Sequence, residues 1–194
     1  MRCLYCDSEI NKYNLYSLFV EEDKLCLECR TKLKINKKVF KIDDLDVMTL
    51  YDYDSIFKEL LIQYKECYDE ALAEVFLYRL NEYLSIKYYG YKILFVLSSK
   101  LKQNQRGFSH LELIYKDLHL KRVNGLYMIN DCVQEGKNKK ERELMKNNYI
   151  YKGDNLDKVL IVDDVITTGS SVLGVYNAIK PYINRAKVLA LCKK

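Results

Sequence analysis

The 194-residue sequence contains no apolar run long enough to span a bilayer, which excludes a conventional transmembrane helix. Residues 1–7 lack the apolar region of a secretory signal. Internal repeats are also absent, which excludes a solenoid. We therefore expect a cytoplasmic protein without membrane insertion.

Proline occurs once and tryptophan not at all, whereas tyrosine occurs 18 times. The net charge of +5 is too small to define a class of partner by itself. The distribution of cations is more informative, because they gather in segments 100–106, 121–122 and 137–142. With 49% apolar residues, the chain supports one medium domain plus a small appendage.

Four of the seven cysteines form two Cys-x-x-Cys pairs near the N-terminus, with residues 7–25 between the pairs. This spacing is typical of a tetrahedral structural zinc site. Residues 1–35 are too few to bury a core unaided, so metal binding would supply most of their folding free energy. Disulfides or a redox dithiol are the alternatives, and a cytoplasmic location disfavours them. We predict Zn²⁺ bound by Cys3, Cys6, Cys26 and Cys29, with a hairpin between the pairs.

Near the C-terminus, an apolar run is followed by two acids and a hydroxyl-rich turn. Residues 159–162 have the composition of a buried parallel strand. Asp163 and Asp164 follow at its carboxyl end, where open α/β sheets bind ligands. Residues 167–171 precede apolar residues at helical spacing, so this turn should form the anion-binding N-terminus of a helix.

The turn lacks the lysine that a Walker-type loop uses to contact the outer phosphates of a nucleotide. Carboxylates accept hydrogen bonds from the vicinal hydroxyls of a sugar, and the turn can hold one terminal phosphate. We therefore predict a site for phosphoribosyl pyrophosphate (PRPP) or a related sugar phosphate. The alternatives are a helix cap with two solvated acids and a different phosphate ligand.

Between these two patterns, short apolar runs alternate with segments of helical periodicity, which favours an α/β fold with a parallel sheet. Residues 93–97 and 186–191 are further expected strands, and helical patterns begin at Asp54, Leu72 and Phe108. We predict a zinc ribbon at 1–35, a linker with short strands at 36–50 and an α/β domain at 51–194. The polar segment 133–148 reads as a solvated surface loop, or as a loop that closes over a pyrophosphate.

The acid–turn pattern resembles the signature of the type I phosphoribosyltransferases. Together with the four cysteines, it is similar to the ComF family of competence proteins. Residues 106–109 resemble that family's Arg-Gly-Phe-Asn segment, with Ser109 in place of Asn. Residues 134–142 resemble its Gln…Lys-x-x-x-x-Arg loop, and Lys65 resembles a lysine that members carry late in their first long helix. One difference is that residues 95–97, Phe-Val-Leu, replace the family's Pro-Val-Pro.

The resemblance implies a type I phosphoribosyltransferase-like sheet flanked by helices, and a PRPP site in which the two acids also serve any catalysis. The implied ligand-binding residues are Ser98, Ser99, Lys100, Arg106, Asp163, Asp164, Thr167, Thr168, Gly169, Ser170 and Ser171. Mg²⁺ would accompany PRPP. The implied role is assistance in the uptake of single-stranded DNA during natural transformation, together with other DNA-uptake proteins. The alternative is an active Mg-dependent phosphoribosyltransferase for nucleobase salvage or a related transfer.

Overall fold

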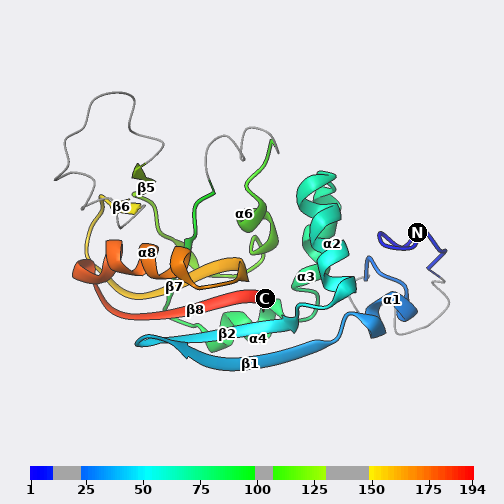
Figure 1. The fold of residues 1–194 in the computed structure, drawn as a ribbon, viewed down its shortest axis with the longest axis horizontal. Helices are drawn as coiled ribbons and strands as arrows, with labels where there is room; N and C mark the ends of the chain where they lie inside the picture. Colours follow the sequence, from blue (N-terminus) through cyan, green and yellow to red (C-terminus); the bar gives the residue numbers. More distant parts are fainter. Residues whose placement is uncertain (11–22, 99–106, 130–148) are drawn as a thin grey trace.

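The computed structural model describes residues 1–10, 23–98, 107–129 and 149–194. In these segments a mostly parallel sheet of six strands has the order β1-β2-β8-β7-β3-β4 (Figure 1). A separate antiparallel pair is formed by β5 and β6. The strands are β1 (Ile35–Ile42), β2 (Leu45–Asp52), β3 (Lys92–Phe95), β4 (Lys121–Arg122), β5 (Leu126–Met128), β6 (Tyr149–Tyr151), β7 (Leu156–Ile166) and β8 (Ile183–Lys193). The predicted α/β fold with a largely parallel sheet is confirmed at this level.

Helices connect and cover the strands (Figure 1). They are α1 (Leu27–Lys32), α2 (Ser55–Glu66), α3 (Ala73–Phe76), α4 (Asn81–Lys87), α6 (His110–Ile114) and α8 (Ser170–Ile179), with 3₁₀ turns η2 (Glu70–Leu72) and η4 (Lys180–Tyr182). α2 begins at a cap in which the Asp54 carboxylate accepts a hydrogen bond from the Phe57 backbone N–H (2.8 Å). The helix ends before Tyr68, whose φ of 59° lies outside the right-handed helical region.

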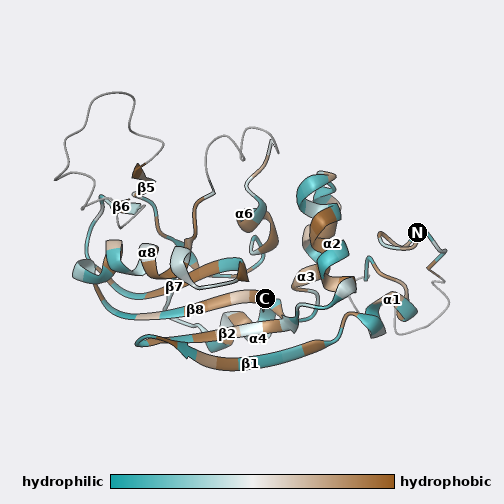
Figure 2. Cartoon of the chain, in the orientation of Figure 1, coloured by the Kyte–Doolittle hydropathy of each residue, from teal (hydrophilic) through white to brown (hydrophobic). Residues whose placement is uncertain are grey.

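α2 is amphipathic, as the brown and teal surfaces of its ribbon show (Figure 2). Phe57, Leu60, Leu61 and Tyr64 are buried, and they recur at helical spacing along one side. Tyr64 packs edge-on against Phe76 of α3 with ring centroids 5.5 Å apart. In the described part of the chain, no helix has the length and apolarity that crossing a membrane requires.

β7 and β8 form the centre of the sheet. Residues 159–162 have no exposed surface, and residues 188–192 of β8 are equally buried. This burial explains the run of aliphatic residues, because a central parallel strand is covered on both faces. β7 is longer than predicted, since its ladder with β8 continues to the pairing of Ile166 with Lys193. Asp163 and Asp164 therefore lie inside the strand, shortly before its last residue, Ile166.

Residues 36–50, expected as a linker with short strands, form two strands of eight residues each in the sheet. β1 pairs with β2 in antiparallel orientation, and β2 pairs with β8 in parallel, with Val47 opposite Val188. β2 is almost wholly buried, including Thr49, whereas β1 is a mostly exposed edge strand. The strands are longer than expected, because the lysines of β1 mask the pattern of an edge strand that meets solvent on both faces.

Candidate functional site

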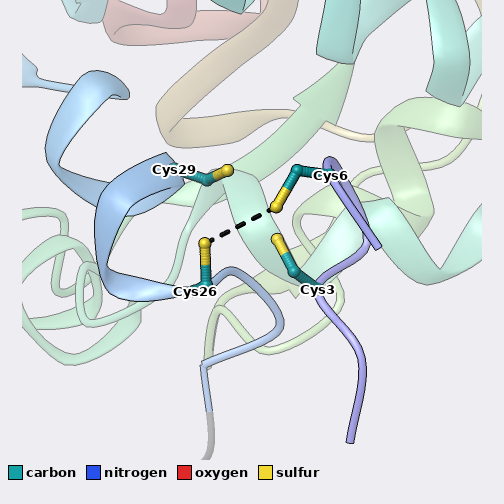
Figure 3. Close-up of side chains that lie close together, drawn as sticks. All are labelled: Cys3, Cys6, Cys26 and Cys29. Carbon is teal, nitrogen blue, oxygen red and sulfur yellow. Dashed lines mark hydrogen bonds between the residues drawn. The ribbon is translucent and has the colours of Figure 1, made fainter. Parts of the chain in front are cut away.

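The four N-terminal cysteines come together as predicted (Figure 3). Their Sγ atoms all lie within 4.8 Å of one another, and the Cys6 and Cys26 sulfurs are 3.7 Å apart. Zinc–thiolate bonds of about 2.3 Å in a tetrahedron separate neighbouring sulfurs by about 3.8 Å. The cluster could therefore hold a metal such as zinc. Four thiolate ligands would leave no position for a reactive water, so such a metal would be structural.

Each pair of cysteines lies on a tight turn, and the two turns bring the four sulfurs together. The Cys3 N–H donates to the Ser8 carbonyl (2.9 Å), and the Asp7 N–H donates to the Cys3 carbonyl (2.9 Å). In the second pair, Cys26 caps α1 and Cys29 lies within that helix. The second cysteine pair thus lies at the start of a short helix. The hairpin expected between the two pairs falls largely outside the described residues.

The cysteine module is anchored to the helices that follow it. The Arg30 guanidinium donates two 2.6 Å hydrogen bonds to the Asp23 carboxylate and a third, of 3.1 Å, to the Val75 carbonyl. The Gln63 side chain of α2 donates to the Leu4 carbonyl (3.0 Å). Because these contacts join the module to α2 and α3, its order is coupled to that of the larger domain.

At the carboxyl end of β7, one acid and the predicted turn line a small pocket. Its wall contains Asp163, Val165, Ile166, Thr167, Gly169, Ser170, Ser171 and Val172. Five of the eleven residues predicted to hold a sugar phosphate, Asp163, Thr167, Gly169, Ser170 and Ser171, are thus brought together. Asp164 and Thr168 do not line this pocket, although Thr168 belongs to the same turn.

The turn is held in shape by a glycine and two hydroxyl groups. Gly169 has φ of 79°, and a Cβ added to it would lie 2.9 Å from the Ile42 Cδ1 of β1. The left-handed backbone is what favours glycine there, since the Ile42 methyl is the end of a flexible side chain that could shift. The Thr168 hydroxyl bonds to that of Ser170 at 3.0 Å, and the Gly169 carbonyl accepts the first helical bond, from Leu173 (2.9 Å). The Ser170 N–H donates to the Thr168 hydroxyl (3.4 Å), so the N–H groups of Ser171 and Val172 are the ones at the start of α8 that an anion would contact.

Asp163 is a partly buried acid with an unusual proton affinity. Burial, followed by the negative charge of Asp164, raises the pKa of Asp163 to about 7. Its Oδ1 accepts a hydrogen bond from the Asp164 backbone N–H (2.9 Å), which favours the ionised form less strongly. A cation or a set of hydroxyl donors in this pocket would bind the ionised carboxylate and release its proton near neutral pH.

Asp164 faces the opposite side of the sheet, as alternation along a strand requires. Its carboxylate forms an ion pair with Lys65 of α2 and lies 2.7 Å from the Nε2 atom of His110 on α6. Burial alone would raise the pKa of Asp164, but the hydrogen bond to His110 and the charge of Lys65 outweigh it and hold this pKa below its usual range. A role for Asp164 in ligand contact stays a prediction, because a ligand would have to reach it through these partners.

The remaining predicted residues lie at or beyond the next strand. The Val96 N–H donates to the Val162 carbonyl (3.0 Å), so Ser98 lies at the same carboxyl edge of the sheet as Asp163. The Tyr149 hydroxyl bonds to the Leu97 carbonyl (3.3 Å) and ties β6 to this edge. Ser99, Lys100 and Arg106 fall outside the described residues, as does the whole of the basic segment 133–148.

Sequence reasoning missed His110. Its side chain is buried against Asp164, and its carbonyl accepts a 2.6 Å hydrogen bond from the Tyr64 hydroxyl. The chain contains only two histidines, and this one follows the 106–109 segment directly. Its position next to that segment could have marked His110 as a candidate site residue. Its contact with Asp164, 54 residues away, could not be predicted from the sequence.

The raised pKa of Asp163 predicts a pH-dependent effect of Asp163→Asn. An acid whose pKa is higher in the folded protein contributes stability at low pH, and this contribution is lost as the pH rises through about 7. Removing the charge should therefore stabilise the protein by about 2 kcal/mol more at pH 8 than at pH 5. Urea unfolding at both pH values measures this difference.

Asp46→Asn is the control for that prediction, because Asp46 is an exposed acid on strand β2 of the same sheet. It should change stability by equal small amounts at the two pH values. If Asp163→Asn also behaves in this way, the pKa of Asp163 is not raised by its surroundings in the folded protein. The description of Asp163 as an acid with a raised pKa is then wrong.

Comparison with known proteins does not place the chain in a family. No protein-family model matches its sequence, and no curated protein matches it significantly. Inferences about function therefore rest on the chemistry of the two sites and on the motifs themselves.

Proposed function

We propose that the chain binds PRPP or a related ribose 5-phosphate at the carboxyl edge of its sheet. The observation that carries this proposal is the pocket in which Asp163 faces the turn of residues 167–171. An acid and an anion-binding turn at one pocket suit a ligand with hydroxyl donors at one end and a phosphate at the other. The fold would then be that of the type I phosphoribosyltransferases, which the parallel sheet permits.

In this arrangement the N–H groups at the start of α8 and the hydroxyl of Ser170 would receive the 5-phosphate, and the Thr168 hydroxyl, 3.0 Å from that of Ser170, would orient it. Asp163 would accept hydrogen bonds from the ribose hydroxyls. Mg²⁺, which favours carboxylate and phosphate oxygens, would accompany the pyrophosphate and offset its charge. The absence of a lysine in the turn fits a single phosphate better than a triphosphate.

Calorimetric titration with two probes tests the two ends of the pocket separately. Thr168→Val should weaken binding of ribose 5-phosphate about tenfold, because Ser170 loses the hydroxyl that orients its own hydroxyl and N–H at the charged phosphate. Asp163→Asn should weaken ribose 5-phosphate by a similar factor but leave inorganic phosphate unaffected or bound more tightly, since a nearby negative charge is removed.

Asp46→Asn should leave both affinities unchanged. No heat from PRPP, ribose 5-phosphate or phosphate in the presence of Mg²⁺ would refute the proposal. Equal loss of both probes in Asp163→Asn would refute the assignment of Asp163 to the ribose hydroxyls.

We further propose, from the resemblance to the ComF family, that the chain assists the handling of single-stranded DNA during natural transformation in the cytoplasm. Its lysine-rich segments could follow a phosphate backbone, which predicts an affinity that falls steeply with salt. Titration of a fluorescent single strand across a salt series measures this slope. An affinity independent of salt would rule out phosphate contacts by these lysines.

Catalysis is the second candidate, because Asp163 lies in the pocket and the family signature includes active transferases. The same titration is therefore repeated with PRPP, Mg²⁺ and a panel of nucleobases while pyrophosphate is measured. We expect binding without release of pyrophosphate. Steady release with any base would replace the binding role by that of a phosphoribosyltransferase.

A further inference from the structure

A second cavity lies at the opposite, amino-terminal edge of the sheet. It has a volume of about 490 Å³ and is bordered by the first residues of β3, β4 and β7 and by the ends of β5 and β6. The residues that the argument uses are Lys92, Lys121, Lys152, Tyr127, Tyr151 and Asp154. Volumes of about 300–1,000 Å³ are usual for sites that hold small organic ligands.

This cavity is distinct from the proposed sugar-phosphate pocket. Leu156, at the start of β7, borders the cavity, whereas Asp163 in the same strand lines the pocket. At about 3.3 Å per residue, the strand separates the two positions by roughly 23 Å. A ligand of nucleotide size in one site would not touch the other.

The charge of the cavity is unbalanced. Lys92 of β3 and Lys121 of β4 occupy paired positions in neighbouring parallel strands. Like charges side by side on a sheet repel each other, and no acid among the described residues forms an ion pair with either. Lys152, on the wall opposite these strands, adds a third ammonium group that is likewise unpaired within the described segments. An anion in the cavity would relieve this repulsion.

Arg122, the fourth cation at this edge, is already occupied. Its guanidinium is 2.9 Å from a Glu112 carboxylate oxygen and lies over the Phe95 ring at 5.6 Å. Asp154 is the only acid among the residues that border the cavity. The three lysines are therefore the groups that remain for an anionic ligand.

The wall formed by β5 and β6 is built to hold its shape. Gly125 has φ of 94°, and a Cβ there would lie 2.3 Å from the Lys152 carbonyl oxygen. The Lys152 N–H donates to the Gly125 carbonyl (2.7 Å). The Tyr151 hydroxyl closes the next turn by donating to the Asp154 carbonyl (3.0 Å). These bonds fix the backbone at the rim of the cavity.

Tyr127 supplies an aromatic surface at the same rim. It lies in β5 opposite Ile150 of β6, and 49% of its surface is exposed. Exposed tyrosine next to unpaired lysines is the combination that holds a base by stacking and a phosphate by charge. A bare phosphate would leave most of a cavity of this volume empty.

We propose that this cavity binds a free nucleoside monophosphate. Lys92 and Lys121 receive its phosphate, Tyr127 stacks on its base, and Asp154 is the acceptor available to a ribose hydroxyl. The inference goes beyond the proposed function, because it concerns a different edge of the sheet and a ligand that carries its own base.

Titration with 5′-AMP tests the proposal. The wild-type protein should bind 5′-AMP saturably, and Lys92→Ala with Lys121→Ala should weaken it about tenfold per lysine. Tyr127→Leu should weaken binding of 5′-AMP about tenfold, because the stacking of the tyrosine ring on the base is lost. Binding of ribose 5-phosphate, which has no base, should be unaffected. The control is Lys34→Ala with Lys41→Ala, which removes the same charge at two exposed positions that do not border the cavity. It should leave the affinity for 5′-AMP unchanged.

Thr168→Val separates this site from the sugar-phosphate pocket. Binding of 5′-AMP that survives Thr168→Val and falls in the lysine pair supports the cavity, even if ribose 5-phosphate does not bind anywhere. Binding that is lost in Thr168→Val and retained in the lysine pair assigns the nucleotide to the other pocket and overturns the proposal. Absence of saturable 5′-AMP binding overturns it as well, as does binding of an oligonucleotide through these lysines without binding of 5′-AMP.

Discussion

Cys6→Ser is expected to remove the metal from the purified protein and to unfold its N-terminal module. Zinc binding to small thiolate-ligated peptides contributes about 10–16 kcal/mol, and such modules do not fold without it. Of the four cysteines, Cys6 is exposed whereas Cys3 and Cys29 are buried. Its replacement therefore tests loss of a ligand with little loss of packing.

Two measurements follow this change. Elemental analysis should find one zinc per chain in the wild type and less in Cys6→Ser. Hydrogen exchange should lose protection at the Asp7 and Arg30 amides, which are bonded inside the two turns. Because Arg30 also anchors the module to Val75, exchange should rise at the α3 end of the larger domain to a smaller extent.

Cys67→Ser is the matched control, since Cys67 is an exposed cysteine outside the cluster. It should leave both the zinc content and the exchange pattern unchanged. A wild-type protein without metal, or one whose four cysteines form disulfides, would contradict the prediction. The cysteines would then be explained by disulfides or a redox dithiol instead.

The cysteine cluster was predictable from the sequence because its signal is local. Two residues between paired cysteines already place both sulfurs on one tight turn, whatever the rest of the fold does. The centre of the sheet was predictable for a similar reason, since residues 159–162 are apolar throughout and could only be a buried strand. Neither inference needed knowledge of distant contacts.

Other features depend on which elements meet in space. The full length of β1 was hidden because its exposed residues show no core pattern, and it is fixed by pairing with β2. The true end of β7 is set by the length of β8, not by the acids within it. The two acids look equivalent in the sequence, yet alternation along the strand gives them opposite surroundings.

Asp164→Asn is expected to destabilise the protein by about 3 kcal/mol at neutral pH, because breaking a buried ion pair leaves its partner uncompensated. The partner is Lys65, whose side chain is 18% exposed, and the contact of the His110 Nε2 atom changes from a charged carboxylate to a neutral amide. Chemical denaturation of the two proteins measures the difference. Asp46→Asn, an exposed acid, should cost far less.

The pH dependence of Asp164→Asn has the opposite sign from that of Asp163→Asn. The pKa of Asp164 is held below its usual range by His110 and Lys65 against the effect of burial. A lowered pKa contributes stability that is present above the unfolded value of about 4 and is lost as the pH falls toward the folded value. The cost of Asp164→Asn should therefore be full at pH 7 and smaller at pH 3, whereas Asp163→Asn matters most at alkaline pH.

Adding Lys65→Met to Asp164→Asn should recover part of the lost stability, because the unpaired charge is then removed from its partly buried position. If the double variant is less stable than Asp164→Asn alone, Lys65 stabilises the fold through other contacts and the ion-pair account is wrong. Ligand binding supplies the last distinction. An Asp164 that only supports the sheet should leave ribose 5-phosphate affinity within about threefold once stability is restored, whereas one that contacts the ribose would not.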